Sequence, residues 1–412
     1  MSKKVGLLSR NKVFKHIWLA KTGSILGGWF NQVALGQITL TMTGSPTTMG
    51  LVLLSRSLPS VVLGPFISPL VDRYSKKAIM YISDVLRTFL ALIFPVAYIT
   101  DSTTLLYLGA LLLGIAGIMF NPAQQAVLPS IVDKDDLAEA NAINSGTSGI
   151  VSIIGAIIGG IVASFFHPVI CFIINALSYV WSAFCIYKAK WKEKKISNSK
   201  KQSYIYDLKQ GFIEVSTNKA ARAIIIIGIS WGFAGGGYAI LIPILGQEVY
   251  DMGGLGIGML YAIDGLGMLL GAFYVKQFIG ANHKKAIIYY GGAYLTQALF
   301  FAFMTQFSIF ILGAFMLLLM RISSGIITPL DSYLLQFYTP DEVRGRVFSL
   351  HSSTYLGVMQ ISYASLGYLV ELFGVPTMGI VIGIISFICG LTWLIQMKYI
   401  FKETKMKIDT TL

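Results

Sequence analysis

The sequence predicts an all-α polytopic membrane protein, with twelve transmembrane helices in two pseudo-symmetric six-helix bundles. Of its 412 residues, 55% are hydrophobic and only 12% are charged, which is about half the charged share of a soluble protein. Apolar runs of about 20 residues, enough to cross a bilayer, recur along the chain. Lys and Arg gather in alternate loops between these runs, as in membrane proteins of fixed orientation.

The apolar runs define twelve predicted spans, most of them separated by short loops. The spans are 15–41, 47–70, 78–100, 104–128, 139–165, 168–188, 222–249, 253–279, 284–306, 309–335, 345–372 and 376–400. A long polar segment separates the first six from the last six. We therefore expect an N-terminal bundle at 1–188, a basic linker at 189–221, a C-terminal bundle at 222–400 and a tail at 401–412.

The distribution of basic residues predicts the orientation of the chain. The loops on one side hold no Lys or Arg, whereas the opposite loops, the linker and the tail hold many. By the positive-inside rule, both termini and the linker are expected to be cytoplasmic, in the cell membrane. This pattern explains the net charge of +13 without a nucleic-acid partner. The linker either only sets orientation or also binds anionic lipid headgroups.

The two halves of the sequence repeat each other weakly. The segment Ser75-Lys-Lys-Ala-Ile-Met-Tyr81 matches His283-Lys-Lys-Ala-Ile-Ile-Tyr289 at an offset of about 208 residues, and the same offset carries Gly159 onto Gly367. A parallel repeat of six plus six spans predicts a substrate site near the middle of the membrane, between the two halves.

A short charged loop between the second and third predicted spans carries a recognisable motif. Its sequence is Ser68-Pro-Leu-Val-Asp72-Arg73-Tyr-Ser-Lys76-Lys77. This resembles the cytoplasmic loop motif of the major facilitator superfamily, Gly-x-Leu-Ala-Asp-Arg-x-Gly-Arg-Lys, with serine at two positions where the family usually has glycine. The resemblance implies the major facilitator fold and a cytoplasmic gate formed by Asp72, Arg73, Lys76 and Lys77.

Three further segments resemble the macrolide-efflux branch of the drug:proton antiporters. They are Phe120-Asn-Pro-Ala-Gln-Gln-Ala-Val-Leu-Pro-Ser-Ile-Val132, residues 140–160 and Val343-Arg-Gly-Arg-Val-Phe-Ser349. The chain departs from that branch at Ala156, where a proline is typical, and at Leu113, where relatives often carry an arginine. Small residues are expected to let the fifth span approach a neighbour closely. These helix-packing residues are Gly149, Gly155, Gly159 and Gly160.

Charged residues inside the spans are candidates for mechanism, because each costs about 2.5–3.5 kcal/mol at the centre of a bilayer unless it finds a partner or a wet cavity. Asp264 and Arg321 lie at matching depth near the middle of the eighth and tenth spans, so we expect them to pair. Two interpretations remain open. In the first, Asp264 carries the coupling proton and Arg321 competes with that proton for the carboxylate. In the second, the two residues form a permanent ion pair that fixes helix packing.

Three of the charges within the spans of the first half are also candidates. Asp84 and Arg87 lie three residues apart on one helix face and are expected to join a network with the Asp72-Arg73 loop, or to handle protons. Arg56 falls at the repeat position of Asp264. It is a candidate for attracting an anionic or carbonyl-bearing substrate group, or for satisfying a backbone carbonyl.

The family resemblance implies that spans 1, 4, 7 and 10 line the substrate cavity. The candidate contacts are Trp29, Asn31, Gln32, Gln37, Gln124, Trp231, Phe233, Tyr238, Ser324 and Thr328. Aromatic walls with few polar anchors suit bulky amphipathic ligands. Any single aromatic side chain could instead pack in the core or face lipid.

The function expected from the sequence is export of amphipathic drugs or related lipophilic compounds by alternating access, with proton antiport. Lysophospholipid or endogenous metabolite or siderophore transport is the alternative, and a non-transporting membrane sensor is an alternative of another class. The four histidines are scattered and no Walker-type phosphate loop occurs, so no enzyme activity, metal or cofactor is expected. The expected partners are a small lipophilic substrate, protons and membrane lipids, with the protein as a monomer.

Overall fold

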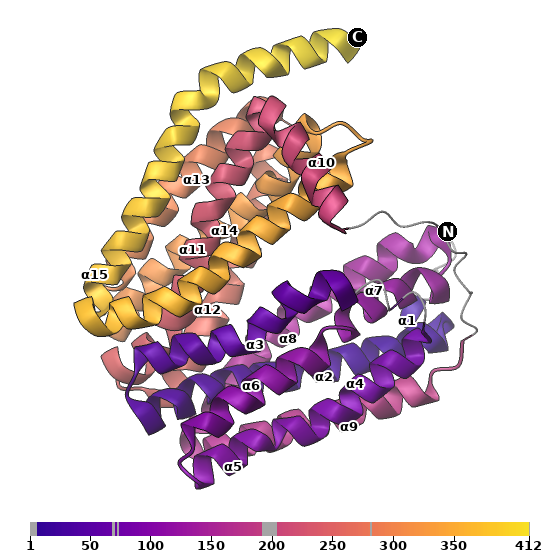
Figure 1. Cartoon of the computed structure of the whole chain (residues 1–412), viewed down its shortest axis with the longest axis vertical. Coiled ribbons are helices and arrows are strands. Elements are labelled where there is room, and N and C mark those ends of the chain that lie inside the picture. The colour runs from indigo at the N-terminus through magenta and orange to yellow at the C-terminus, as the bar shows by residue number, and fades with distance from the viewer. Residues whose placement is uncertain (1–5, 68–70, 72–73, 192–203, 281, 412) are drawn as a thin grey trace. The chain divides into compact units, whose positions relative to one another are not determined.

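The computed structural model describes residues 6–67, 71, 74–191, 204–280 and 282–411, and no strand occurs among them (Figure 1). The helices of the first half are α1 (Leu7–Arg10), α2 (Lys12–Thr43), α3 (Pro46–Ile67), α4 (Lys76–Ala91), α5 (Ile93–Ile99), α6 (Thr103–Gly117), α7 (Phe120–Ile131), a 3₁₀ turn (Lys134–Asp136), α8 (Leu137–Phe165) and α9 (Pro168–Lys188). Those of the second half are α10 (Tyr204–Thr217), α11 (Lys219–Ile244), α12 (Gly253–Tyr274), α13 (His283–Met304), α14 (Phe310–Tyr338) and α15 (Arg344–Thr411), with π-helical segments at Leu245–Val249 and Val275–Ile279.

The described residues include ten helices that are long and apolar enough to cross a membrane. The predicted class, a polytopic helical membrane protein, is therefore confirmed, while the count of twelve spans stays a prediction. Helix α2 is not among the ten. The last two predicted spans are merged in α15, which is interrupted at Gly374, where φ is 79° and ψ is 160°. A positive φ of this size is accessible mainly to glycine.

Two prolines break predicted spans into pairs of helices. Pro95 has no N–H to donate to the carbonyl of Ala91, which is the last residue of α4, and Pro122 stands in the same relation to Ile118, directly after α6. A proline ring also clashes with the carbonyl four residues earlier, so an α-helix is interrupted there. Each pair remains long enough to span a membrane, over Lys76–Ile99 and Thr103–Ile131.

The chain forms two compact units. The first comprises Met1–Lys200 together with Pro243–Ala262, and the second comprises Lys201–Ile242 together with Ile263–Leu412. The end of α11 and the start of α12 therefore pack with the first half of the chain. The remainder of both helices packs with α13, α14 and α15.

The core of the first unit is built around α2 and α9. Helix α2 packs along α9 and α8, and α4 also packs along α9. Phe94 stacks on Phe172 with their ring centroids 5.1 Å apart, and both side chains are fully buried. This packing holds the polar residues of α2 at defined positions along the unit.

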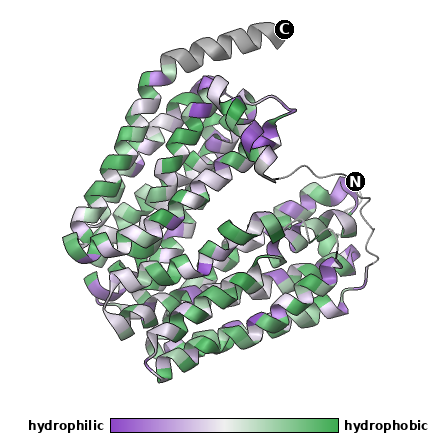
Figure 2. Ribbon diagram, in the orientation of Figure 1, coloured by the Kyte–Doolittle hydropathy of each residue, from purple (hydrophilic) through white to green (hydrophobic). Residues whose placement is uncertain are grey.

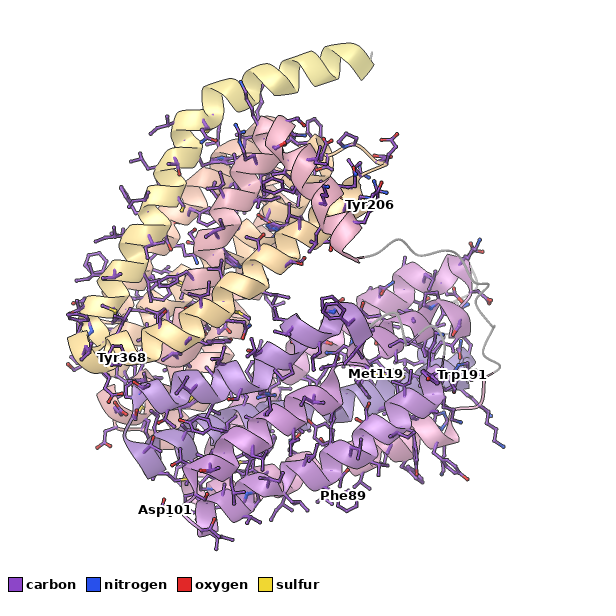
Figure 3. All side chains as sticks on the ribbon, in the orientation of Figure 1. Phe89, Asp101, Met119, Trp191, Tyr206 and Tyr368 are labelled. Atoms are coloured by element: carbon purple, nitrogen blue, oxygen red, sulfur yellow. The ribbon has the colours of Figure 1, made fainter. Side chains whose placement is uncertain are left out.

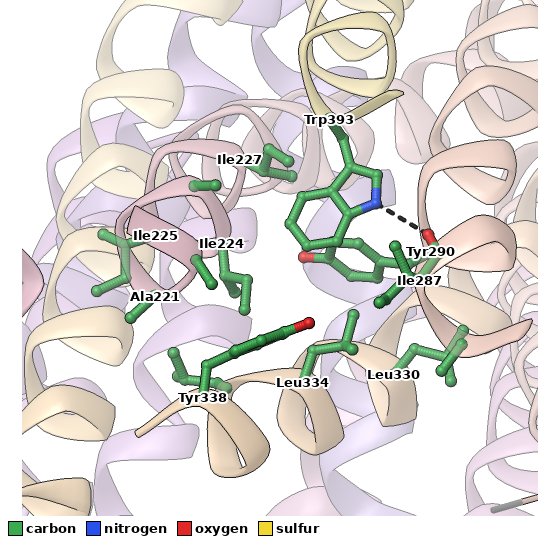
Figure 4. Packing of buried hydrophobic residues seen from close by; sticks show 14 of the residues in the cluster. Ala221, Ile224, Ile225, Ile227, Ile287, Tyr290, Leu330, Leu334, Tyr338 and Trp393 are labelled. Carbon is green, nitrogen blue, oxygen red and sulfur yellow. Dashed lines mark hydrogen bonds between the residues drawn. The ribbon is translucent and has the colours of Figure 1, made fainter. Parts of the chain in front are cut away.

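The core of the second unit joins α11, α13, α14 and α15 around Trp393. Its indole Nε1 donates a hydrogen bond to the carbonyl of Ile287 at 2.9 Å, and its ring meets the edge of Tyr290 with centroids 4.8 Å apart (Figure 4). Isoleucine and leucine side chains of α11 and α14 complete the cluster. These contacts hold the Tyr290 ring in one orientation, and its hydroxyl donates a hydrogen bond to Oδ1 of Asp331.

Many large apolar side chains lie on the outside of the helices. Figure 2 shows hydrophobic residues along most of the length of both bundles. Phe89 on α4 is 68% exposed (Figure 3), and Ile99 and Ile311 are 76% and 75% exposed. Apolar surface on this scale is costly in water, but it is the surface that lipid chains solvate.

The backbones of α3 and α6 approach closely at Gly114. A Cβ atom added there would lie 2.2 Å from the carbonyl oxygen of Arg56, a backbone atom that cannot rotate away. We expect Gly114→Ala to push the two helices apart and to lower stability by about 1–3 kcal/mol, measured by thermal unfolding in detergent. Gly28→Ala is the matched control, since nothing lies within 4 Å of its added Cβ. Equal stability of the two variants would contradict this packing.

Candidate functional site

The second unit contains a cavity of about 420 Å³. Its wall is mainly aromatic and apolar, with a few polar groups. The lining residues that bear on its chemistry are Trp231, Tyr238, Gln297, Arg321, Thr328 and Tyr355. Three of the predicted cavity residues, Trp231, Tyr238 and Thr328, thus lie together with the predicted mechanistic residue Arg321.

Arg321 of α14 and Asp264 of α12 form an ion pair beside this cavity. Their side chains are 16% and 15% exposed, and the guanidinium carbon also lies 4.6 Å from the centroid of the Tyr238 ring. The pair is made within the second unit alone. An arginine held by a carboxylate and an aromatic face is strongly oriented, because both contacts gain strength away from water.

Glycines bring α12 and α14 close enough for this pair to form. A Cβ at Gly267 would lie 2.6 Å from the Cβ of Arg321, and one at Gly271 would lie 2.2 Å from the carbonyl oxygen of Ile322. On the facing helix, a Cβ at Gly325 would lie 2.5 Å from the carbonyl oxygen of Met268. Small residues at helix contacts permit such backbone approach in membranes.

A second cavity of about 190 Å³ adjoins the first and shares Trp231, Thr328 and Tyr355 with it. It is bordered by the carboxylate of Asp331 on α14 and the imidazole of His351 on α15. Asp331 is a further charge within the tenth predicted span to which no role was assigned, and His351 is not among the candidates chosen from the sequence. The available signal was the one-face spacing of Thr328, Asp331 and Ser332 on a helix, which places the carboxylate beside a predicted cavity residue.

In the first unit, Arg56 lies among polar side chains of α2 and α12. Its Nη1 donates to Oε1 of Gln32 at 2.9 Å, and Nε2 of Gln32 donates to the Tyr261 hydroxyl at 3.2 Å. Trp29 meets the Tyr261 ring edge-on, with centroids 5.4 Å apart. No carboxylate pairs with Arg56 among the described residues. The structure thus brings together the predicted residues Trp29, Gln32 and Arg56.

The other predicted cavity residues do not line the two cavities of the second unit. Asn31 is buried and accepts a hydrogen bond from Nδ2 of Asn175 at 3.4 Å. Ser324 is buried and donates to the carbonyl of Met320 within its own helix. The carbonyl of Phe233 accepts from Oγ of Ser362.

Two predicted glutamines lie in the first unit. Gln37 packs against the start of α12, where a Cβ at Gly254 would lie 2.5 Å from its Oε1 atom. Nε2 of Gln124 is buried and has no hydrogen-bond partner within the described part of the chain. Gln124 is therefore a polar group whose partner this structure does not show.

Asp84 and Arg87 form a contact inside the first bundle. Nη1 of Arg87 lies 3.4 Å from Oδ1 of Asp84, and both residues are buried. The guanidinium carbon lies 4.3 Å from the centroid of the Phe120 ring, so the charge is enclosed by α4 and α7. The residues with which this pair was predicted to interact, Asp72 and Arg73, lie outside the described residues.

Of the predicted gate lysines, Lys77 contacts the end of α9. Its Nζ donates to the carbonyl oxygens of Tyr187 and Ala189, at 2.9 and 2.7 Å, and lies 5.6 Å from the centroid of the Trp191 ring. A cation is favourable at a helix C-terminus, where carbonyl groups lack helical partners. Lys76 is buried. Lys77 therefore ties the end of α9 to the first turn of α4.

The predicted glycine face of α8 contacts α2 and the start of α12. A Cβ at Gly155 would lie 3.1 Å from the Cβ of Trp29, and one at Gly159 would lie 3.2 Å from the Cα of Phe30. At Gly160 it would lie 2.7 Å from the carbonyl oxygen of Gly254. Gly149 lies on the same helix, nearer its start.

Long apolar helices that enclose charged pairs and an aromatic cavity define a multi-span membrane transporter. The family model described as Major Facilitator Superfamily matches residues 17–362, and the chain belongs to this superfamily.

The curated relatives include exporters. The chain is 25% identical over 365 residues to the putative bacilysin exporter BacE of Bacillus subtilis (strain 168), covering 86% of this chain and 87% of the relative. It is 24% identical over 357 residues to macrolide efflux protein A of Streptococcus pyogenes, covering 82% and 85%. A crystal structure of a mutant of the nucleoside transporter NupG has the same fold, with a TM-score of 0.78 at 11% identity over 93% of this chain and 99% of that one. The predicted family and its likeness to macrolide-efflux proteins are thus confirmed.

Proposed function

We propose that this protein exports amphipathic, lipophilic small molecules by alternating access, driven by proton entry. The observation that carries the proposal is the cavity of about 420 Å³ with aromatic walls and the Asp264–Arg321 ion pair beside it. Such a cavity offers a large apolar contact area and few polar anchors, which suits bulky ligands of varied shape. The names of the relatives, a bacilysin exporter and a macrolide efflux protein, support export of small molecules.

The ion pair supplies a means of coupling to protons. Asp264 can accept a proton only at the expense of its contact with Arg321, because a neutral carboxyl attracts a guanidinium far less strongly. Protonation therefore frees Arg321, which keeps the Tyr238 ring as a neighbour. A ligand that binds more tightly when Asp264 and Arg321 are separated shifts the equilibrium toward that conformation. Protonation of Asp264 shifts it in the same direction.

A second candidate function follows from Arg56. Within the described residues its partner is the amide of Gln32 and not a carboxylate. A guanidinium of this kind suits a carboxylate or phosphate group, so transport of a lysophospholipid or of an acidic metabolite such as a siderophore is the alternative. The chain is proposed to work as a monomer in the cell membrane, with both termini cytoplasmic and in contact with anionic lipids.

The proposal is tested in cells that lack their own multidrug exporters and express this chain. They are loaded with a fluorescent lipophilic cation and then energised, and we expect them to retain less dye than vector cells until an uncoupler is added. Retention equal to that of vector cells would contradict drug export. A parallel assay with a labelled lysophospholipid separates the alternative, since movement of that lipid alone would favour lipid transport.

A further inference from the structure

The second unit contains a carboxylate–imidazole pair that the proposed coupling at Asp264 does not use. Oδ2 of Asp331 lies 3.4 Å from Nε2 of His351, and their side chains are 19% and 15% exposed. The other carboxylate oxygen, Oδ1, accepts a hydrogen bond from the Tyr290 hydroxyl at 2.6 Å. Both oxygens of Asp331 thus face a group that can share or donate a proton.

The surrounding structure holds this pair in place. Tyr290 is fully buried, and its ring lies edge-on to Trp393 (Figure 4) and to Tyr294. A Cβ at Gly228 of α11 would lie 3.0 Å from Nε2 of His351. A glycine at this position therefore leaves the room that the imidazole occupies beside the carboxylate.

The pair has access to space that water can fill. Asp331 and His351 both border the cavity of about 190 Å³, together with the hydroxyl-bearing residues Thr328, Ser332 and Ser352. A water molecule occupies about 30 Å³ in the liquid, so the cavity has room for several. The larger cavity shares Trp231, Thr328 and Tyr355 with it, so the two spaces adjoin at these residues.

No other cation lies in the wall of this cavity among the described residues. Helix α11 contributes Gly228 and Trp231, α13 contributes Tyr294, and α15 contributes Tyr355 besides His351. Tyr290 faces the carboxylate from α13, and the thiol of Cys389 on α15 packs against the same aromatic cluster. Arg321 is paired with Asp264 and lies roughly 15 Å from Asp331 along the axis of α14.

The imidazole is therefore the group available to neutralise Asp331. An ionised carboxylate beside a neutral imidazole leaves an uncompensated negative charge in a weakly polar interior, whereas one added proton makes the pair neutral overall. Histidine is the side chain whose protonation ordinarily changes near physiological pH. A pair of this kind can thus bind and release a proton as its surroundings change.

We infer that Asp331 and His351 form a proton-binding site separate from Asp264, in which the proton resides on the imidazole against the carboxylate and exchanges through the adjoining cavity. The inference deepens the proposed function, since it rests on proton-driven export for its physiological role. The site itself can be tested without any transport assay.

The test uses the small number of histidines in the chain, which has four. Full-length protein labelled with ¹⁵N-histidine is studied in detergent by NMR at one fixed pH, and the His351 signals are identified by their loss in His351→Gln. We expect the ring-nitrogen shifts of His351 to report a smaller imidazolium fraction in Asp331→Asn than in wild type, because the imidazolium loses its counter-charge. Asp341→Asn, which removes an exposed carboxylate of the same unit, should leave that fraction unchanged.

The same imidazolium fraction of His351 in wild type and Asp331→Asn would overturn the inference. Gly228→Ala provides a second variant if Asp331→Asn does not fold, because the added Cβ displaces the ring from the carboxylate and should lower the imidazolium fraction in the same way. A chain that exports no dye, yet in which the protonation of His351 depends on Asp331, retains this site and loses the proposed function. A chain that exports dye without this dependence loses this site alone.

Discussion

Asp264→Asn should abolish uphill export while leaving a folded protein in the membrane. The amide has nearly the shape of the carboxylate, but it carries no charge for Arg321 and binds no proton. The ion pair beside the main cavity would then no longer change with protonation, so the substrate gradient should collapse to the level of vector cells. Dye efflux from energised cells measures this loss. Binding of the dye and its downhill movement should not require the carboxylate.

The matched control is Asp251→Asn, which changes an exposed aspartate between α11 and α12. Its positive φ of 50° is one that asparagine adopts readily, so export should be unaffected. Immunoblotting of membranes and size-exclusion chromatography in detergent verify the amount and folding of each variant. Undiminished uphill export by Asp264→Asn would remove Asp264 from the coupling role.

Arg321→Ala should destabilise the protein by about 3 kcal/mol, the usual effect of removing one partner from a buried ion pair. The variant leaves the Asp264 carboxylate without its counter-charge and also removes the contact with the Tyr238 ring. Thermal unfolding in detergent measures the change. Arg222→Ala, which removes an exposed arginine of the same unit, should have little effect.

The double variant tests whether the loss of stability comes from the contact between Asp264 and Arg321. Adding Asp264→Asn to Arg321→Ala removes the unpaired negative charge and should recover part of the lost stability. A double-mutant cycle then gives a coupling energy that differs clearly from zero. Additive effects of the two substitutions would show that the side chains do not interact in the folded protein.

The general architecture could be predicted because the thickness of the bilayer sets the length of the apolar runs, and the orientation of the chain sets the charge of the loops. The span predicted at 168–188 coincides with α9, where His167 and Pro168 mark the helix start. The breaks at Pro95 and Pro122 were not predicted, since an apolar run looks continuous whether or not its helix is interrupted. Hydropathy reports on solvent, while helix continuity depends on backbone hydrogen bonds.

The site could be predicted only in part, because a sequence gives the depth of a residue more readily than the direction of its side chain. Matching depth was sufficient to suggest the Asp264–Arg321 pair. It was insufficient for Asn31, which faces Asn175 within the bundle. The pair of Asp331 and His351 depends on the packing of two different helices and on Gly228 of a third, and no local spacing reports that arrangement.

The most direct test of proton-coupled export is to follow substrate and protons together in one preparation. The purified protein is reconstituted in liposomes, a pH gradient is imposed, and a fluorescent lipophilic cation and the internal pH are recorded simultaneously. We expect uphill dye movement with a matching opposite flow of protons, and loss of both in Asp264→Asn. Uphill dye movement without any change in internal pH, or identical traces for wild type and Asp264→Asn, would contradict it.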